Sequence, residues 1–232
     1  FLADQDVFHR FVRASPDEIL RLDPWGIPWT RDEHGRIAQR PFGGHSFPRA
    51  TLAADKTGFF EMQTLYDELL RYKSFTRYDE FFVTDILVED GRFSAILGIH
   101  APSGERVTLQ AKALLIATGG GGTLYGFTTY SQTVTGDGMA MAYRAGLPLE
   151  DMEFLQFHPT GLVSPPSVRG LLVPESVRGD GGVLRNTAGE RFMFNYVPDV
   201  FRSQYAETEA EADRWYADPD NNRRPPELLP RD

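Results

Sequence analysis

The alternation of apolar and polar residues predicts helices in the first third of the chain. Residues 6–11 form a short amphipathic stretch, and a second helix is expected over residues 15–23, where a serine, a proline and two acids open the segment. Such residues favour the first turn of a helix, because they cap free N–H groups or complement the helix dipole. Over residues 57–72, apolar side chains return at roughly helical spacing, which predicts a third helix.

The middle of the chain has a pattern typical of β-structure. Three apolar-rich runs, 81–89, 92–100 and 106–111, are separated by turn-forming residues at 89–91 and 102–104. This arrangement predicts a β-meander. The short apolar run that follows, residues 113–117, is expected to be a strand buried on both faces.

Beyond residue 130 the pattern returns to helices and loops. Residues 137–144 are expected to form a helix that ends at Gly146, the usual position of a glycine after a helix. Residues 207–215 have the pattern of a polar helix. Residues 218–226 are rich in polar residues and proline, and they indicate an exposed connection.

Composition narrows the possible function. The 232 residues are 41% hydrophobic and 25% charged, which is ordinary for a soluble globular protein of one large domain, or one domain with part of another. The net charge of −9 argues against binding to nucleic acid. The chain contains no cysteine, so it forms no disulfide and ligates no iron–sulfur cluster through thiolates. No apolar run approaches the length of a membrane span.

Two motifs near the middle of the chain point to a specific chemistry. They are TGDGMAMAYRAG at 135–146 and FLQFHPTG at 154–161, and they follow an apolar run that ends in small residues at 117–120. Glycines in such a place let the backbone approach a ligand closely. Together with five further segments in the same order, these residues resemble the flavoprotein subunits of succinate dehydrogenases and fumarate reductases. The five segments are residues 54–70, 77–93, 113–120, 175–184 and 189–196.

The resemblance implies an α/β fold in two parts. Residues 1–155 would form the later part of an FAD-binding domain with a β-meander, and residues 156–232 the start of an α+β capping domain. The strand–GxGxxG–helix unit that holds the ADP part of FAD in this family has no match here, since GGGGTLYG at 119–126 has the wrong spacing. We therefore expect an internal fragment of a longer flavoprotein, inactive in isolation.

The resemblance also implies a cofactor site for FAD and no metal site. Residues Ala117, Thr118, Gly119 and Gly120 would contact the flavin, and Asp137 matches the acid of the family's TGDG motif. From spacing alone, a buried strand end followed by a helix cap explains these residues equally well.

The resemblance also implies two substrate-binding residues and one catalytic residue. His158, within HPTG, would donate a hydrogen bond to a carboxylate of a dicarboxylate, and Phe42 would close the pocket near the flavin. Glu175 would belong to a proton relay that feeds a catalytic arginine. Without the resemblance, they would be a structural histidine, a core aromatic and a solvated acid. The main departure is Pro174, which stands where the family has a threonine that binds the substrate carboxylate.

The implied function is the FAD-dependent interconversion of succinate and fumarate, a step of the tricarboxylic acid cycle and of electron transport. Electrons would pass to an iron–sulfur subunit. Membrane-anchor subunits would hold the complex, with the flavoprotein peripheral on the cytoplasmic face of the bacterial inner membrane. L-aspartate oxidase is the alternative chemistry, favoured by the inserted residues 165–168 and opposed by the tail at 204–232. A catalytically silent fragment is the alternative from a different class.

Overall fold

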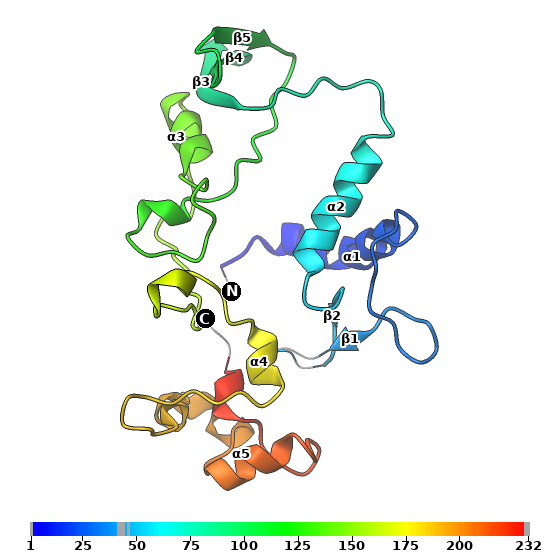
Figure 1. The fold of residues 1–232 in the computed structure, drawn as a ribbon, viewed down its shortest axis with the longest axis vertical. Coiled ribbons are helices and arrows are strands. Elements are labelled where there is room, and N and C mark those ends of the chain that lie inside the picture. Colours follow the sequence, from blue (N-terminus) through cyan, green and yellow to red (C-terminus); the bar gives the residue numbers. More distant parts are fainter. Residues whose placement is uncertain (1, 41–44, 46, 230–232) are drawn as a thin grey trace. The chain divides into compact units, whose positions relative to one another are not determined.

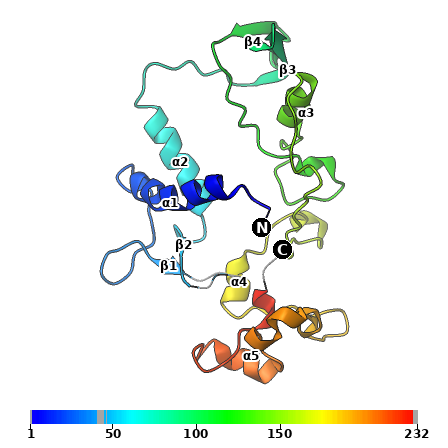
Figure 2. The same cartoon turned by 180° about the vertical axis from the view of Figure 1, so that it is seen from behind.

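The computed structural model describes residues 2–40, 45 and 47–229, and these form two compact units. One unit consists of residues 2–76 together with 178–229, and the other of residues 77–177. Figures 1 and 2 show the elements from opposite sides. The mixed helix-and-sheet fold class is confirmed. The sequence predicts a boundary near residue 155, between a flavin domain and a capping domain. This boundary stays a prediction.

The first unit opens with one long helix, α1 (Gln5–Leu22). Asp4 caps it by accepting hydrogen bonds from the N–H groups of Asp6 and Val7. The prediction of two separate helices, with the second beginning at residue 15, is wrong, because a single helix runs through this position. The Ser15 hydroxyl donates to the carbonyl of Phe11 within the helix, at 2.8 Å, instead of capping a new one. Pro16 removes one backbone donor but does not end the helix.

A small core holds α1 to the next elements. Strands β1 (Gln39–Arg40) and β2 (Ala50–Thr51) pair antiparallel, and helix α2 (Thr57–Leu69) follows in the predicted place. The buried cluster consists of Ile27, Trp29 and Ala53, with Ile19, Leu22, Ile37 and Phe60 packed around it. Burial of such apolar surface is the main stabilising contribution in a unit of this kind.

The rest of the first unit is built from short helices. They are the 3₁₀ helices Phe192–Tyr196, Asp199–Gln204 and Pro226–Leu228 and the helix α5 (Glu209–Trp215). Helix α5 confirms the predicted polar helix. The prediction that residues 218–226 form an exposed connection is only partly correct, since Pro225 and Pro226 are fully buried. The cause is a parallel bridge between Tyr205 and Arg224, which holds the end of this connection against the segment that precedes α5.

The second unit contains the predicted meander. Strands β3 (Phe81–Glu89), β4 (Arg92–His100) and β5 (Arg106–Gln110) form an antiparallel sheet in the order β3-β4-β5. Asp90 and Gly91 both have positive φ at the first turn, which suits a tight hairpin. Helix α3 (Asp137–Arg144) lies beside β3 (Figures 1 and 2). Its Arg144 donates to the carbonyl of Thr84, at 2.8 Å.

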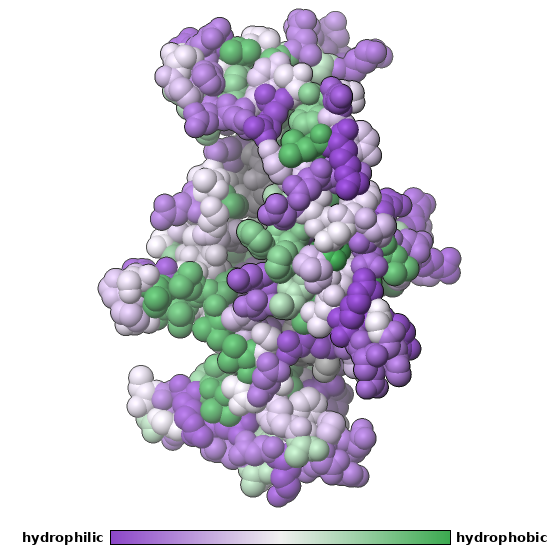
Figure 3. Space-filling view, turned by 45° about the vertical axis from the view of Figure 1, so that its right-hand side comes forward, coloured by the Kyte–Doolittle hydropathy of each residue, from purple (hydrophilic) through white to green (hydrophobic). Residues whose placement is uncertain are grey.

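The buried strand expected over residues 113–117 is not formed. This segment has no regular secondary structure and pairs with none of the strands of the described residues, and Leu115 is 90% exposed. An apolar run becomes a buried strand only where strands pair with both its edges, because its backbone N–H and C=O groups need partners. Other large apolar side chains are also exposed, as the hydrophobic patches on the face in Figure 3 show.

Within the described part of the chain, we find no helix with the length and apolar character needed to cross a bilayer.

Candidate functional site

The glycine-rich segment predicted to contact the flavin lies against the start of α3. The carbonyl of Gly120 accepts a hydrogen bond from the N–H of Gly136, at 3.1 Å. A Cβ atom added to Gly138 would stand 2.9 Å from the Cβ of Thr118, so the two backbones approach as closely as they do only because residue 138 is a glycine. The structure therefore brings residues 117–120 together with Asp137.

The local geometry of this segment fits a cofactor that needs close backbone approach. Gly136 precedes α3 with a φ of 80°, and as a glycine it has no side chain with which to cap the first N–H groups of the helix. Free N–H groups at a helix start favour anionic ligands such as a diphosphate. The Asp137 carboxylate accepts a hydrogen bond from the hydroxyl of Thr135, at 2.6 Å, which fixes its orientation at this end of the helix.

Gly138→Ala tests this packing directly. We expect the free energy of unfolding to fall by about 1–3 kcal/mol, because the added methyl group would overlap the Thr118 side chain. We also expect less flavin to remain bound. Thermal unfolding and the ratio of flavin to protein absorbance would measure both effects. Gly126→Ala is the matched control, since a Cβ at that position meets nothing within 4 Å. Equal behaviour of the two variants would contradict the prediction.

The motif that contains His158 forms one arm of a short hairpin. Backbone hydrogen bonds of 2.8 Å join residues 160–162 to residues 170–173, and an antiparallel bridge links the two arms. Because the arms are antiparallel, a residue just before the first arm and a residue just after the second lie at the same end of the ladder. His158 and Glu175 occupy these two places, so the hairpin brings together residues that are 17 positions apart in the sequence.

The loop between the glycine-rich segment and α3 packs against this hairpin. The guanidinium of Arg169 lies 5.3 Å from the centre of the Phe127 ring. A Cβ on Gly161 would stand 2.9 Å from the methyl group of Thr129, and a Cβ on Gly170 would stand 3.2 Å from the carbonyl of Thr128. The loop that follows the glycine-rich segment and the hairpin predicted to hold substrate are thus packed together within one unit.

A hydrogen bond within the HPTG motif orients the ring of His158. The ring is half-buried, and its Nδ1 accepts a hydrogen bond from the N–H of Thr160, at 3.3 Å. A neutral imidazole that accepts at Nδ1 carries its hydrogen on Nε2, an assignment that follows from this hydrogen bond. The Nε2–H group is a donor of the kind that binds a carboxylate.

Glu175 is the first residue of helix α4 (Glu175–Gly179) and is half-buried. The carbonyl of Pro174 accepts from the N–H of Val177, at 3.1 Å, and this bond closes the first turn. Arg178 is the buried residue of the helix, at 4% exposure. One short helix thus carries an acid at its start and a buried arginine three residues later.

Phe42 lies outside the described residues, and its role in closing the pocket stays a prediction. Arg40 is the last described residue before Phe42. Its guanidinium forms an ion pair with the carboxylate of Asp180, at 2.8 Å. Asp180 directly follows α4. The roles expected for His158 and Glu175, and for the residues assigned to the flavin, likewise stay predictions.

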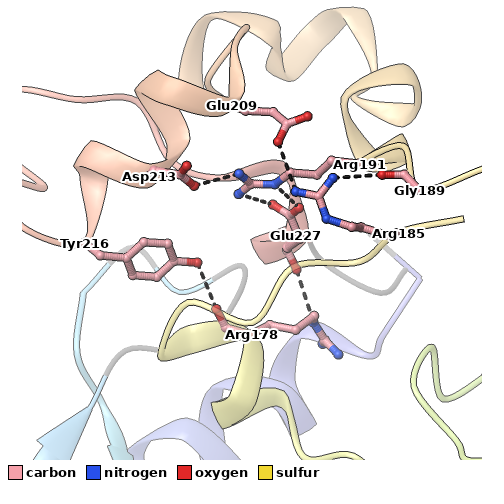
Figure 4. A network of polar contacts seen from close by, with 8 residues as sticks. All are labelled: Arg178, Arg185, Gly189, Arg191, Glu209, Asp213, Tyr216 and Glu227. Carbon is pink, nitrogen blue, oxygen red and sulfur yellow. Dashed lines mark hydrogen bonds and ion pairs between the residues drawn. The ribbon is translucent and has the colours of Figure 1, made fainter.

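A buried ion-pair network near α4 was not predicted from the sequence (Figure 4). Arg191 donates two hydrogen bonds to the carboxylate of Glu227, at 2.6 and 3.1 Å, and one to Asp213, at 2.7 Å. The side chains of Arg191 and Glu227 are 1% and 0% exposed. Burial lowers the pKa of Arg191, but the hydrogen bonds with Glu227 and Asp213 outweigh it and raise that pKa above its usual range.

The network reaches α4 through Arg178. The Nε of Arg178 donates to the backbone carbonyl of Glu227, at 3.1 Å, and the hydroxyl of Tyr216 donates to the backbone carbonyl of Arg178, at 2.9 Å (Figure 4). Burial, and then the charge of Glu227, raise the pKa of Tyr216 to about 12. The Tyr216 hydroxyl therefore keeps its proton at neutral pH and remains a hydrogen-bond donor.

Across residues 2–40, 45 and 47–229, no three histidine or acidic side chains gather closely enough to hold a metal ion.

Comparison with known proteins matches this chain to a family model described as an FAD binding domain, over residues 1–221. The fumarate reductase flavoprotein subunit of Mycobacterium tuberculosis is 46% identical over 196 residues, which cover 84% of this chain and 33% of that protein. The succinate dehydrogenase flavoprotein subunit of Rickettsia conorii is 43% identical over 206 residues, which cover 85% of this chain and 34% of that protein.

A solved structure gives the same result for the fold. A variant of the FrdA subunit of E. coli quinol fumarate reductase superposes with a TM-score of 0.80 at 42% identity, covering 85% of this chain and 34% of that one. The chain therefore spans about a third of the length of the relatives that it matches. The family resemblance found in the sequence is confirmed.

Proposed function

Because this chain belongs to the FAD binding domain family, we propose that it takes part in the FAD-dependent interconversion of succinate and fumarate. Its relatives at 43–46% identity are named as flavoprotein subunits of fumarate reductases and succinate dehydrogenases. The observation that carries the proposal is the packing of the loop after the glycine-rich segment against the hairpin, whose ladder places His158 and Glu175 at one end.

FAD, when bound, supplies the capacity to exchange two electrons with the substrate. The protein supplies position and charge. Residues 117–120 and the start of α3 would hold the cofactor through backbone contacts, as the glycine packing permits. His158 would orient one carboxylate of the dicarboxylate through Nε2–H. Glu175 would hold a proton on its carboxyl group and transfer it along the relay that protonates the substrate carbon.

We further propose that the electrons pass to an iron–sulfur subunit. The chain has no cysteine with which to ligate a cluster itself. The similarity to a subunit of quinol fumarate reductase supports a multisubunit assembly. In this proposal, membrane-anchor subunits complete the complex and the flavoprotein is peripheral, at the cytoplasmic face of the bacterial inner membrane.

Replacing His158 with alanine tests the proposed substrate site. In the full-length flavoprotein, we expect the dissociation constant for succinate or fumarate to rise at least tenfold, about 1.4 kcal/mol, because the carboxylate loses a hydrogen-bond donor. FAD content should not change. The dissociation constant can be measured from the perturbation of flavin absorbance on titration with the dicarboxylate.

His100→Ala is the matched control, because His100 belongs to β4 of the same unit and bonds Ser103. If the His158 variant binds within twofold of the parent, His158 is a structural residue. If the parent itself neither retains FAD nor oxidises succinate, the proposed function is wrong.

A further inference from the structure

The loop that follows the glycine-rich segment is closed at its base. The N–H of Gly136 donates to the carbonyl of Gly120, at 3.1 Å, so the two ends of the loop meet. Further into the loop, the N–H of Thr123 donates to the carbonyl of Val134, also at 3.1 Å, and the Thr123 hydroxyl donates to the same carbonyl. A loop joined in this way is compact, and its tip keeps a fixed place relative to residues 117–120.

The tip of this loop lies on the hairpin of residues 160–173. The guanidinium of Arg169 lies over the Phe127 ring, 5.3 Å from its centre, within the distance of a cation–π contact. Glycines in both arms of the hairpin, Gly161 and Gly170, let the backbone come close to the loop, because an added Cβ would stand 2.9 and 3.2 Å from it. The contact between Arg169 and Phe127 thus joins two segments that already pack closely.

Arg169 holds the hairpin at the end away from the predicted substrate site. It directly follows the 3₁₀ helix Pro166–Val168 at the tip, whereas His158 and Glu175 lie at the other end of the ladder. Each arm of the ladder has only three or four residues, joined by backbone hydrogen bonds of 2.8 Å. A hairpin this short turns as a whole, so the position of its tip determines the position of its other end.

We propose that Arg169 is a positioning residue for the reaction, which fixes the hairpin, and with it His158, relative to the glycine-rich segment through its contact with Phe127. This inference rests on the proposed function, because it gives Arg169 no contact with substrate or cofactor. Small displacements of a bound substrate from the group it reacts with lower rates by large factors. Losing the contact should therefore lower turnover more than binding, since His158 itself is unchanged.

Arg169→Met tests the inference, because it removes the charge and keeps an unbranched side chain. Phe127 is 39% exposed, so the contact is weaker than a fully desolvated one. In the full-length flavoprotein, we expect kcat for fumarate reduction to fall by about three- to tenfold. The KM for fumarate, the FAD content and the rate of flavin reduction by an external donor should stay within twofold of the parent. Arg169→Lys keeps the cation and should recover most of the lost kcat.

Hydrogen exchange tests the same contact without turnover. The N–H groups of Leu162, Gly170 and Val173 form the hairpin ladder, and they exchange when the hairpin opens locally. In the Arg169→Met protein, peptides that cover residues 160–173 should exchange faster than in the parent. Peptides from β4 of the same unit should exchange at the parent rate.

Two further variants show whether the effect comes from this contact. Phe127→Leu should reproduce the losses of Arg169→Met, and the double variant should lose no more than either single variant, because all three lack the same contact. Arg106→Met is the matched control, at an exposed arginine of β5 in the same unit, and it should behave as the parent.

An Arg169→Met protein with the kcat and hydrogen exchange of the parent would overturn the inference. Losses that add in the double variant, or an equal loss in Arg106→Met, would overturn it as well. A parent protein without fumarate reduction would instead overturn the proposed function and, with it, the role of Arg169 in turnover.

Discussion

Replacing Glu175 with glutamine is expected to lower the rate of fumarate reduction by about 10²–10⁴-fold, the usual contribution of a general acid–base group. The change keeps the size of the side chain and removes its exchangeable proton. Glu175 is half-buried at the start of α4, at the end of the hairpin ladder where His158 also lies. An acid held there can move a proton, whereas an amide cannot.

Steady-state kinetics of the full-length flavoprotein would measure this effect. The affinity for the dicarboxylate should change little, because glutamine preserves most of the hydrogen-bonding shape. Flavin reduction by an external donor should not change either, since it needs no proton on the substrate carbon. Glu153→Gln, at an exposed acid of the same unit, is the control and should be silent. A Glu175 variant that works at nearly the parent rate would identify Glu175 as an ordinary loop acid.

Replacing Arg191 with methionine should lower the free energy of unfolding by about 3–5 kcal/mol. The change leaves the carboxylate of Glu227 uncompensated, with a side chain that is 0% exposed. Removing one partner of a buried ion pair costs far more than removing one partner of an exposed pair. The shift of the urea midpoint, followed by tryptophan fluorescence at constant slope, would measure the loss.

Two further variants make this prediction specific. The double variant Arg191→Met with Glu227→Leu should recover most of the lost stability, because a buried ion pair can often be replaced by apolar residues of similar volume without a net cost. Arg202→Met breaks an exposed pair with Asp199, and its effect should stay below about 1 kcal/mol. If the double variant is as unstable as the single one, the network contributes through packing instead of charge compensation.

The sequence predicts best those elements whose signals are local. The meander was predicted with nearly correct bounds, since residues with positive φ, Asp90, Gly91 and Gly104, mark its turns. Helix α3 was predicted with its observed bounds for the same reason, because Gly136 and Gly146 stand on either side of it with φ of 80° and 88°. In each case the residues that set the boundary are adjacent to the element.

The features that were missed depend on partners far along the chain. Residues 113–117 have the composition of a buried strand, but no neighbouring residue indicates whether partner strands are present. The pairing of Arg191 with Glu227 spans 36 residues, and the charge pattern does not single out either partner. The hairpin that joins His158 and Glu175 was hidden for the same reason, since its arms are only three or four residues long and lack the alternation of a strand.

The hairpin ladder also determines where the protein can change length during evolution. Residues 165–168 lie between the two arms, mostly in the 3₁₀ helix Pro166–Val168, and form no part of the ladder. Additions or losses there alter the tip and leave His158 and Glu175 at their common end. A single residue added within 160–162 would instead shift the register and turn the following side chains to the opposite face. Length differences among homologues should therefore accumulate at the tip, where they leave the ladder unchanged.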